Sequence, residues 1–203
     1  MSSDAPVSGG ADLTVVAAAL RRGEVVILPT DTIYGLVAAA DDSAAVERMF
    51  AEKQRPADVR VAVLVADVEQ ARRYVLLGEA GEALAAACWP GPLTIVAPRH
   101  APGSLAAGDD DTLGVRCPDD DRLRALAAAV GPLAATSANR HGRETAATAE
   151  GVASDFPGLL VVDGGPRVAS ASTVISVVDH PVQVLREGPI ARTDIEAILT
   201  AGS

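Results

Sequence analysis

The stretch EVVILPTDTIYG, residues 24–35, carries the strongest structural signal in this sequence. Residues 24–28 are rich in β-branched side chains and are closed by Pro29, a pattern that is typical of a short buried strand. The polar residues 30–32 follow directly and predict a turn. We therefore expect a strand that carries hydroxyl and carboxyl groups to the edge of a sheet, where ligands bind in open α/β folds.

Similar helices and strands alternate on both sides of this stretch. Asp12 at an N-cap position and Gly23 as a stop signal bound a predicted helix over 12–22. Further helices are predicted over 43–53, 67–76, 79–88, 120–129, 148–155 and 192–200, and strands over 61–65, 93–97, 112–116, 132–135, 159–163, 172–178 and 182–186. This interleaving predicts an α/β or α+β fold, and the close spacing of the last strands indicates a mixed sheet.

The chain length suits one large domain. A chain of 203 residues buries about 70% of the surface that its unfolded form exposes. No repeat of fixed period and no linker rich in Pro, Ser or Gly divides the sequence. We predict a flexible N-terminus over 1–10, whose residues are small and polar, and a single domain over 11–203.

Charge and aromatic content exclude two kinds of nucleic-acid binder. The formal net charge is −10, so a protein that neutralises many phosphates over a broad surface is not expected. Aromatic residues make up only 2%, which leaves little material for stacking the bases of single strands. Lys53 is the only lysine, and all other basic residues apart from histidine are arginine. Any anion site must therefore be local.

Cysteine usage and hydropathy predict a cytoplasmic protein with no membrane contact. Cys88 and Cys117 lack C-x-x-C spacing, and no run combines a basic start, an apolar stretch and a cleavage site. Apolar runs are interrupted by Arg, Gly or Asp well short of the roughly 20 residues that span a bilayer. We therefore expect reduced thiols.

Several familiar catalytic motifs are absent. The sequence contains no P-loop, no G-x-G-x-x-G fingerprint and no G-x-S-x-G elbow. Its histidines, His100, His141 and His180, are widely separated and lack metal-ligand spacing. The acidic runs 109–111 and 119–121 are better interpreted as a solvated loop and a helix N-terminus. We predict no protein-held metal site.

Cationic and hydroxyl side chains lie instead in loops at the ends of predicted elements. Lys53, Arg55, Arg116 and Arg186 are placed to clamp a polyphosphate and a carboxylate, because Arg binds such groups as a fork and Lys as a point charge. Each signal alone has a plain structural alternative. The Lys-x-Arg pair also suits a solvated helix end, and the residues 30–32 suit a turn held by its own hydroxyls.

Seven motifs that occur in the same order along the chain favour the binding role over the structural alternative. They are PTDTIYG at 29–35, KQRP at 53–56, WPGPLT at 89–94, GVRCP at 114–118, TSAN at 136–139, STV at 172–174 and LREGP at 185–189. Together they resemble the YrdC-like family, whose single-domain members are threonylcarbamoyl-AMP synthases. The resemblance covers about residues 12–191. It implies a twisted open sheet of parallel and antiparallel strands, surrounded by helices, with a large concave cleft.

The resemblance also implies a reaction and its participants. The family condenses L-threonine, bicarbonate or CO2, and ATP with Mg2+ into threonylcarbamoyl-AMP and pyrophosphate. A downstream tRNA threonylcarbamoyl transferase complex then modifies an adenosine next to the anticodon. A weak contact with tRNA or double-stranded RNA is a further implication. The chemistry needs no enzymic nucleophile, because the threonine amine itself forms a carbamate that attacks the α-phosphorus.

Site residues follow by matching the family's motifs position by position. Lys53 and Arg55 are implied as catalytic residues. The implied ATP contacts are Lys53, Arg55, Thr112, Ser137, Asn139 and Arg186, and the implied threonine contacts are Thr30, Tyr34, Arg116, Ala135 and Ser172. The segment 59–64 departs from the family's usual pattern, with Leu64 at a position that is usually histidine.

Two alternatives remain open on the sequence. A relative that makes a different carbamoyl-adenylate from carbamoyl phosphate is compatible with the altered segment 59–64. A non-catalytic RNA-binding module is the other, although the net charge of −10 and the spacing of Lys53 and Arg55 favour an enzyme.

Overall fold

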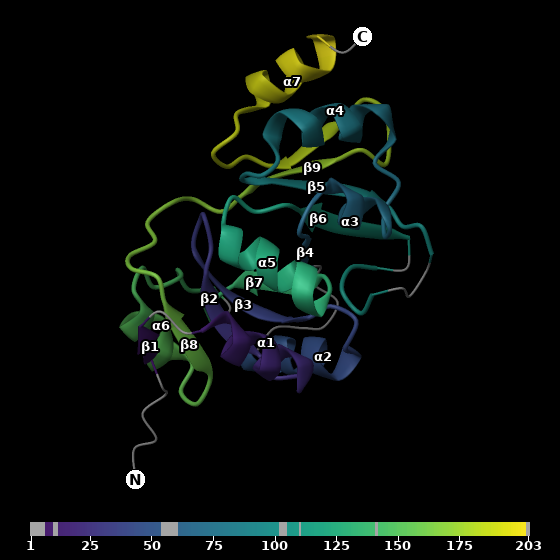
Figure 1. The fold of residues 1–203 in the computed structure, drawn as a ribbon. Coiled ribbons are helices and arrows are strands. Elements are labelled where there is room, and N and C mark those ends of the chain that lie inside the picture. The colour runs from purple at the N-terminus through teal and green to yellow at the C-terminus, as the bar shows by residue number, and fades with distance from the viewer. Residues whose placement is uncertain are drawn as a thin grey trace.

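A mixed sheet of ten strands runs through the computed structural model of this chain (Figure 1), in the order β1-β8-β2-β3-β7-β4-β6-β5-β9-β10. The structure describes residues 7–9, 12–53, 61–101, 105–109, 111–140 and 142–201. The strands are β1 Val7–Gly9, β2 Val26–Pro29, β3 Tyr34–Ala39, β4 Ala62–Leu64, β5 Leu93–Pro98, β6 Thr112–Arg116, β7 Leu133–Ser137, β8 Leu160–Asp163, β9 Thr173–Ser176 and β10 Gln183–Arg186. The pairs β1/β8, β2/β8, β4/β6 and β5/β9 are parallel and the other pairs are antiparallel. The predicted mixed sheet is confirmed.

Helices cover the sheet at the predicted places, although the helix predicted over 67–76 extends only over Val68–Arg72. They are α1 Leu13–Arg21, α2 Ser43–Lys53, α3 Val68–Arg72, α4 Gly78–Cys88, α5 Asp121–Val130, α6 Ala149–Asp155 and α7 Arg192–Ala201. Figure 1 shows α1 and α2 beside β2 and β3, whereas α4 and α7 lie at the opposite end, beyond β5 and β9. Asp12 caps α1 by accepting a hydrogen bond from the backbone N–H of Thr14 at 2.9 Å.

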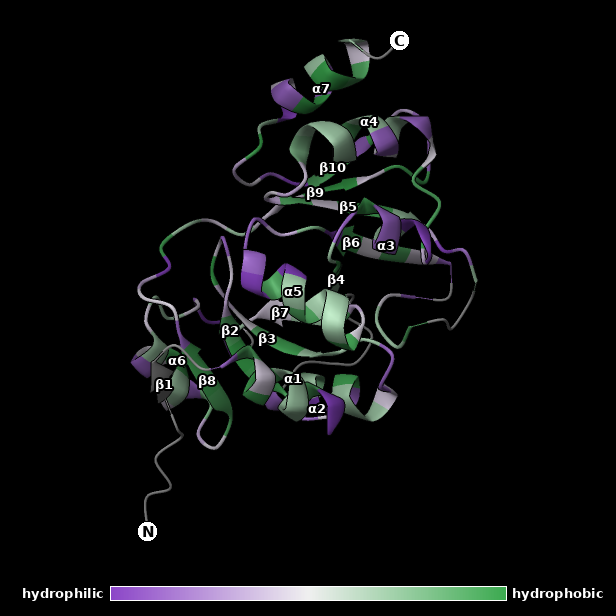
Figure 2. Cartoon of the chain, viewed as in Figure 1, coloured by the Kyte–Doolittle hydropathy of each residue, from purple (hydrophilic) through white to green (hydrophobic). Residues whose placement is uncertain are grey.

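Strand β2 is apolar on both faces because it lies between two hydrophobic layers. Val26 and Leu28 pack in a cluster with residues of α1 and α5, while Ile27 points the other way into a larger cluster with residues of α2. Figure 2 shows the same contrast, with hydrophobic colour in the central strands and hydrophilic colour at outer helix ends and loops. A strand buried on both faces reads as a continuous apolar run, as the sequence does here.

The sequence pattern did not predict strands β1 and β3. Strand β3, Tyr34–Ala39, contains Gly and Ala and shows no alternation of polar and apolar residues, so no strand was predicted there. It forms because it pairs on one side with β2 and on the other with β7, and all six of its residues are buried. A buried position between two strands overrides a weak intrinsic preference.

Three residues of the terminus that we predicted to be flexible, Val7–Gly9, form strand β1, and the flexibility of 1–10 stays a prediction. Val7–Gly9 pair in parallel with Val161–Asp163 of β8, so backbone hydrogen bonding extends the sheet by one strand. The remaining boundary, one domain over 11–203, stays a prediction that the continuous sheet supports. None of the helices in the described ranges is long and apolar enough to cross a membrane.

Shortening a side chain in the centre of β3 tests how much this strand contributes. Leu36 is fully buried and Leu76 is 51% exposed. We expect Leu36→Ala to lower the free energy of unfolding by about 2–5 kcal/mol, because it removes buried methyl groups and leaves a cavity. The matched control Leu76→Ala should lower it by less than about 1 kcal/mol. Urea denaturation measures both, and equal losses would contradict this account of the core.

Candidate functional site

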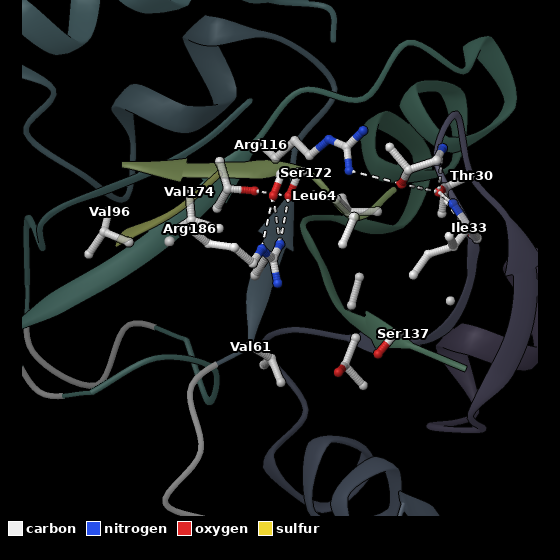
Figure 3. A pocket seen from close by; sticks show the side chains of 18 of the residues that line it. Thr30, Ile33, Val61, Leu64, Val96, Arg116, Ser137, Ser172, Val174 and Arg186 are labelled. Atoms are coloured by element: carbon white, nitrogen blue, oxygen red, sulfur yellow. Dashed lines mark hydrogen bonds between the residues drawn. The ribbon is translucent and has the colours of Figure 1, made fainter. Parts of the chain in front are cut away.

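A cavity of about 260 Å³ lies over the central strands of the sheet (Figure 3). Its walls come from the turn between β2 and β3, from strands β4 to β7, and from β9 and the end of β10. The volume is near the lower end of small-molecule sites, which span roughly 300–1,000 Å³. A concave site is therefore present, although it is smaller than the large cleft that the resemblance implies.

Strand geometry explains which residues face this cavity. Thr112, Gly114 and Arg116 are alternate residues of β6, so their Cα substituents point to the same face. All three line the cavity, as do Thr94 and Val96 at alternate positions of the neighbouring β5. Because side chains alternate between the two faces of a strand, every second residue of β5 and β6 lines the cavity.

The turn between β2 and β3 is held by the hydroxyl of Thr30. This hydroxyl donates to the carbonyl of Ile33 at 2.7 Å and accepts the backbone N–H groups of Thr32 and Ile33 at 3.0 and 3.1 Å. The same oxygen also contacts the Thr32 hydroxyl at 2.9 Å, so it makes four contacts within the turn. Thr30 lines the cavity, but its hydroxyl is committed to the turn, as the structural alternative anticipated.

Arg116 is a cation of the cavity that bonds three different residues. Its Nη2 donates to Oδ2 of Asp31 at 2.6 Å, its Nη1 to the hydroxyl of Thr32 at 3.3 Å, and its Nε to the carbonyl of Gly91 at 3.0 Å. Burial lowers the pKa of Arg116, and the charge of Asp31 opposes that shift. A guanidinium stays protonated at neutral pH, so the cavity contains a fixed positive charge.

A second guanidinium stands near the first. Arg186 donates from Nε and Nη2 to the carbonyl of Ser172 at 3.0 and 2.8 Å, and the Ser172 hydroxyl contacts that of Thr94 at 2.9 Å. The pKa of Arg186 is lowered by burial and by the positive charge of Arg116. Two cations in one apolar-walled cavity raise the local potential for an anion.

Lys53 lies at the end of α2 and is only 2% exposed. Its Nζ donates to the carbonyl of Ser137 at 2.7 Å, to the Ser137 hydroxyl at 3.1 Å, to the Thr136 hydroxyl at 3.3 Å and to Oδ1 of Asn139 at 3.1 Å. Three residues predicted to contact one nucleotide, Lys53, Ser137 and Asn139, are therefore brought together from α2 and the end of β7. Thr136 and Ser137 line the cavity directly.

Most predicted site residues meet in the cavity. Its lining includes Thr30, Tyr34, Thr112, Arg116, Ala135, Ser137, Ser172 and Arg186. Lys53 and Asn139 are behind the lining; Lys53 contacts it through Thr136 and Ser137, and Asn139 through Ser137. Arg55 lies outside the described residues, so its place stays a prediction. The roles of all these residues also stay predictions.

Several lining residues received no role from the sequence. Thr32, Thr94 and Thr136 lie within the PTDTIYG, WPGPLT and TSAN motifs and their hydroxyls contact the predicted residues. Arg167 was also missed, although its Nε donates to the carbonyl of Thr30 at 2.8 Å. The three threonines could have been found because they lie within the motifs. Arg167 lies in no motif, and nothing in the sequence around it indicates its contact with Thr30.

Burial shifts the pKa of both thiols upward. Cys117 follows Arg116 directly, and burial raises its pKa to about 11. Burial also raises the pKa of Cys88. Because only the thiolate is nucleophilic, this shift disfavours a nucleophilic role for either thiol.

Residues 18–188 match the model of the Sua5/YciO/YrdC family, whose description reads "Telomere recombination". The chain belongs to this family. A threonylcarbamoyl-AMP synthase of Bacillus subtilis is 39% identical over 193 residues, covering 90% of this chain and 55% of the relative. One of Pyrococcus abyssi is 37% identical over 193 residues, covering 92% of this chain and 57% of the relative.

Solved structures of this family share the fold. The crystal structure of P. abyssi Sua5 complexed with L-threonine has a TM-score of 0.83 and 36% identity, covering 92% of this chain and 56% of that one. The crystal structure of E. coli YciO has a TM-score of 0.78 and 26% identity, covering 87% of this chain and 89% of that one. The present chain thus spans about half the length of the first two curated relatives, and all but a small part of YciO.

Removing Asp31 tests the buried ion pair of this family member. The pairs Arg116–Asp31 and Arg22–Glu24 have the same N–O separation of 2.6 Å, but the first is 7% and 12% exposed and the second 60% and 49%. We expect Asp31→Ala to lower the free energy of unfolding by about 3–5 kcal/mol, because it leaves a buried cation without its partner. The control Glu24→Ala should cost less than about 1 kcal/mol. Chemical denaturation compares them, and a small loss for both would refute the structural role of the pair.

Proposed function

We propose that this chain is a threonylcarbamoyl-AMP synthase, which forms threonylcarbamoyl-AMP and pyrophosphate from L-threonine, bicarbonate or CO2, and ATP. The observation that carries the proposal is the cavity lined by Arg116, Arg186 and Ser137, with Lys53 and Asn139 bonded to Ser137 behind its wall. Curated relatives over 90% and 92% of the chain bear that name. A structure of one such relative was solved with L-threonine.

The carboxylate of threonine is assigned to Arg116. Each terminal nitrogen of a guanidinium carries two hydrogens, and the contacts to Asp31 and Thr32 use one hydrogen of each. The hydrogens that these contacts leave over are proposed to bind the carboxylate, a group that arginine favours. Thr30, Tyr34, Ala135 and Ser172 are assigned to the walls of the same threonine site.

The nucleotide is assigned to the remaining polar groups. Lys53 and Arg55 are proposed to neutralise the phosphates as catalytic residues, with Ser137 and Asn139 orienting Lys53 and Arg186 adding a second cation. Thr112 is assigned to the same nucleotide. Such groups stabilise the charge that develops on the non-bridging oxygens and on the departing pyrophosphate.

The reaction needs positioning and charge neutralisation rather than a protein nucleophile. The threonine amine adds to CO2 and loses a proton, which gives a carbamate. A carbamate oxygen then attacks the α-phosphorus of ATP, and the bond to the β-phosphate oxygen breaks to release pyrophosphate. Holding both substrates in one water-poor cavity converts a bimolecular step into an effectively unimolecular one.

Mg2+ enters this proposal with the nucleotide. Among the residues that the structure describes, no three His, Cys, Asp or Glu side chains gather into a metal site. Mg2+ in such enzymes is usually held by substrate phosphates and few protein ligands. The described residues therefore offer no ready-made ligand set, and no step above is assigned to the ion.

The proposed product implies partners beyond this chain. An activated carbamoyl-adenylate must be passed to a transferase that acts on an adenosine of tRNA, next to the anticodon. We propose that this occurs in the cytoplasm, and that any contact with tRNA or double-stranded RNA is weak, because the net charge is −10.

Pyrophosphate release tests the proposed reaction. The purified chain is incubated with ATP, Mg2+, bicarbonate and each amino acid in turn. We expect release with threonine and much less with serine or valine, because a site that bonds a hydroxyl and fits a methyl group rejects analogues that lack either. Release with carbamoyl phosphate alone would favour a different carbamoyl-adenylate, and no release under any condition would favour a binding module.

Lys53 is the sharpest single-residue test of the phosphate role. We expect Lys53→Met, which keeps the apolar stem, to lower kcat/KM by about 100-fold or more because the positive charge is lost. The exposed Arg73 provides a control, and Arg73→Ala should leave the rate unchanged. Thermal melting checks that both variants are folded. A folded Lys53→Met variant with normal turnover would remove this residue from the mechanism.

A further inference from the structure

A second cation joins the loop after β7 to the end of α2. Arg140 follows Asn139 directly, and its Nη1 donates to the carbonyl of Glu52 at 2.8 Å. Its Nε and Nη2 donate to the carbonyl of Asp155 at 3.1 and 2.9 Å. Glu52 immediately precedes Lys53 at the end of α2, and Asp155 is the last residue of α6. One side chain therefore ties the ends of two helices to the loop after β7.

The ends of these two helices attract a cation for a general reason. The last four carbonyls of a helix have no partner within it, and the helix dipole places partial negative charge there. The carbonyls of Glu52 and Asp155 are two such groups, and the guanidinium of Arg140 donates to both. The guanidinium carbon also lies 5.0 Å from the ring centroid of the buried Phe156, which adds a cation–π contact. A lysine could not reproduce this combination, because it lacks the planar fork.

The position of Lys53 depends on the same two pieces of backbone. Its Nζ reaches Ser137 and Asn139 in the loop, while its own backbone ends α2. The bond from Arg140 to Glu52 holds the helix against the loop without using the lysine side chain. The side-chain amide of Asn139 also donates to the carbonyl of Arg140 at 3.2 Å, and its Oδ1 faces the Nζ of Lys53. Arg140 therefore fixes both the helix end that carries the lysine and the loop that accepts its hydrogen bonds.

We propose that Arg140 is a positioning residue for Lys53, which holds the end of α2 against the loop after β7 so that the ammonium group meets the nucleotide phosphates in one orientation. Arg140 is not among the described residues that line the cavity, so it acts through Lys53 and not on a substrate. This inference rests on the proposed synthesis of threonylcarbamoyl-AMP. A displacement of about 1 Å in such a group can cost about 100-fold in rate, so the contact bears on turnover.

Steady-state kinetics of two variants in the same loop test this role. Arg140→Met removes the donors and keeps an apolar side chain beside Phe156. We expect it to lower kcat about 10-fold and to leave the KM for threonine within about twofold, because Arg116 is held by other contacts. The matched control is Arg143, whose exposed guanidinium lies 3.7 Å from a side-chain oxygen of Asp155. Arg143→Met should leave both constants unchanged.

A double-mutant cycle separates positioning from a merely structural role. In a Lys53→Met background the group that Arg140 positions has already lost its charge, so Arg140→Met should change kcat/KM by less than about twofold. A structural role would lower kcat/KM by the same factor in both backgrounds, and that result would overturn the proposal. Thermal melting checks the fold of each variant. If Arg140→Met does not fold, Arg140→Lys takes its place in the same cycle.

Lys53 also supplies a direct readout, because it is the only lysine of the chain. Protein with isotopically labelled lysine therefore gives one ammonium signal in NMR spectra. We expect the ammonium hydrogens to exchange with water about 10-fold faster in Arg140→Met than in the wild type, because the end of α2 is less firmly held. Arg143→Met should exchange at the wild-type rate. Equal rates in all three proteins would mean that Arg140 does not hold Lys53, and the proposal would be refuted.

The exchange measurement needs no substrate and is therefore independent of the proposed reaction. If the wild type releases no pyrophosphate with threonine, the proposed function fails, and the exchange rates still decide whether Arg140 holds Lys53. If the wild type is active and a folded Arg140→Met variant is equally active, only the positioning inference fails.

Discussion

The buried ion pair between Arg116 and Asp31 joins parts of the chain that are far apart in sequence. Asp31 lies in the turn between β2 and β3, whereas Arg116 ends β6, on the far side of β7 and β4 in the sheet. The same guanidinium reaches the carbonyl of Gly91, in the loop before β5. An unpartnered charge at this depth is costly, so the ion pair holds the turn between β2 and β3 against the end of β6 at the cavity.

This arrangement makes fold and site depend on the same groups. The hydroxyl of Thr30 closes the turn that presents Asp31, and Arg167 holds the carbonyl of Thr30 from the segment that follows β8. At the end of that segment, the carbonyl of Ser172 accepts a hydrogen bond from Arg186. The cations of the cavity are therefore fixed by protein acceptors before any ligand arrives, which lowers the cost of ordering them on binding.

Some of the architecture could be predicted from the sequence because its signals are local. The continuous apolar run at 24–28 predicts a buried strand, and the structure has β2 there, between two hydrophobic layers. Strand β3 could not be predicted, because Gly35 and the alanines at its end have little strand preference and are ordered by neighbours on both sides. The three-residue strand Val7–Gly9, which pairs with β8, could not be predicted either, because the sequence there shows no strand pattern.

The sequence by itself determined the mixed sheet with helical cover, the single lysine at the end of a helix, and the ordered motifs that carry the family resemblance. Each of these depends on side chains close together in the chain. Only the tertiary structure decided that Lys53 meets Ser137 and Asn139, that the hydroxyl of Thr30 serves its own turn, and that Arg140 donates to Glu52. Hydrogen-bond direction depends on which donor and acceptor meet in space, and that is set by strand pairing over long separations.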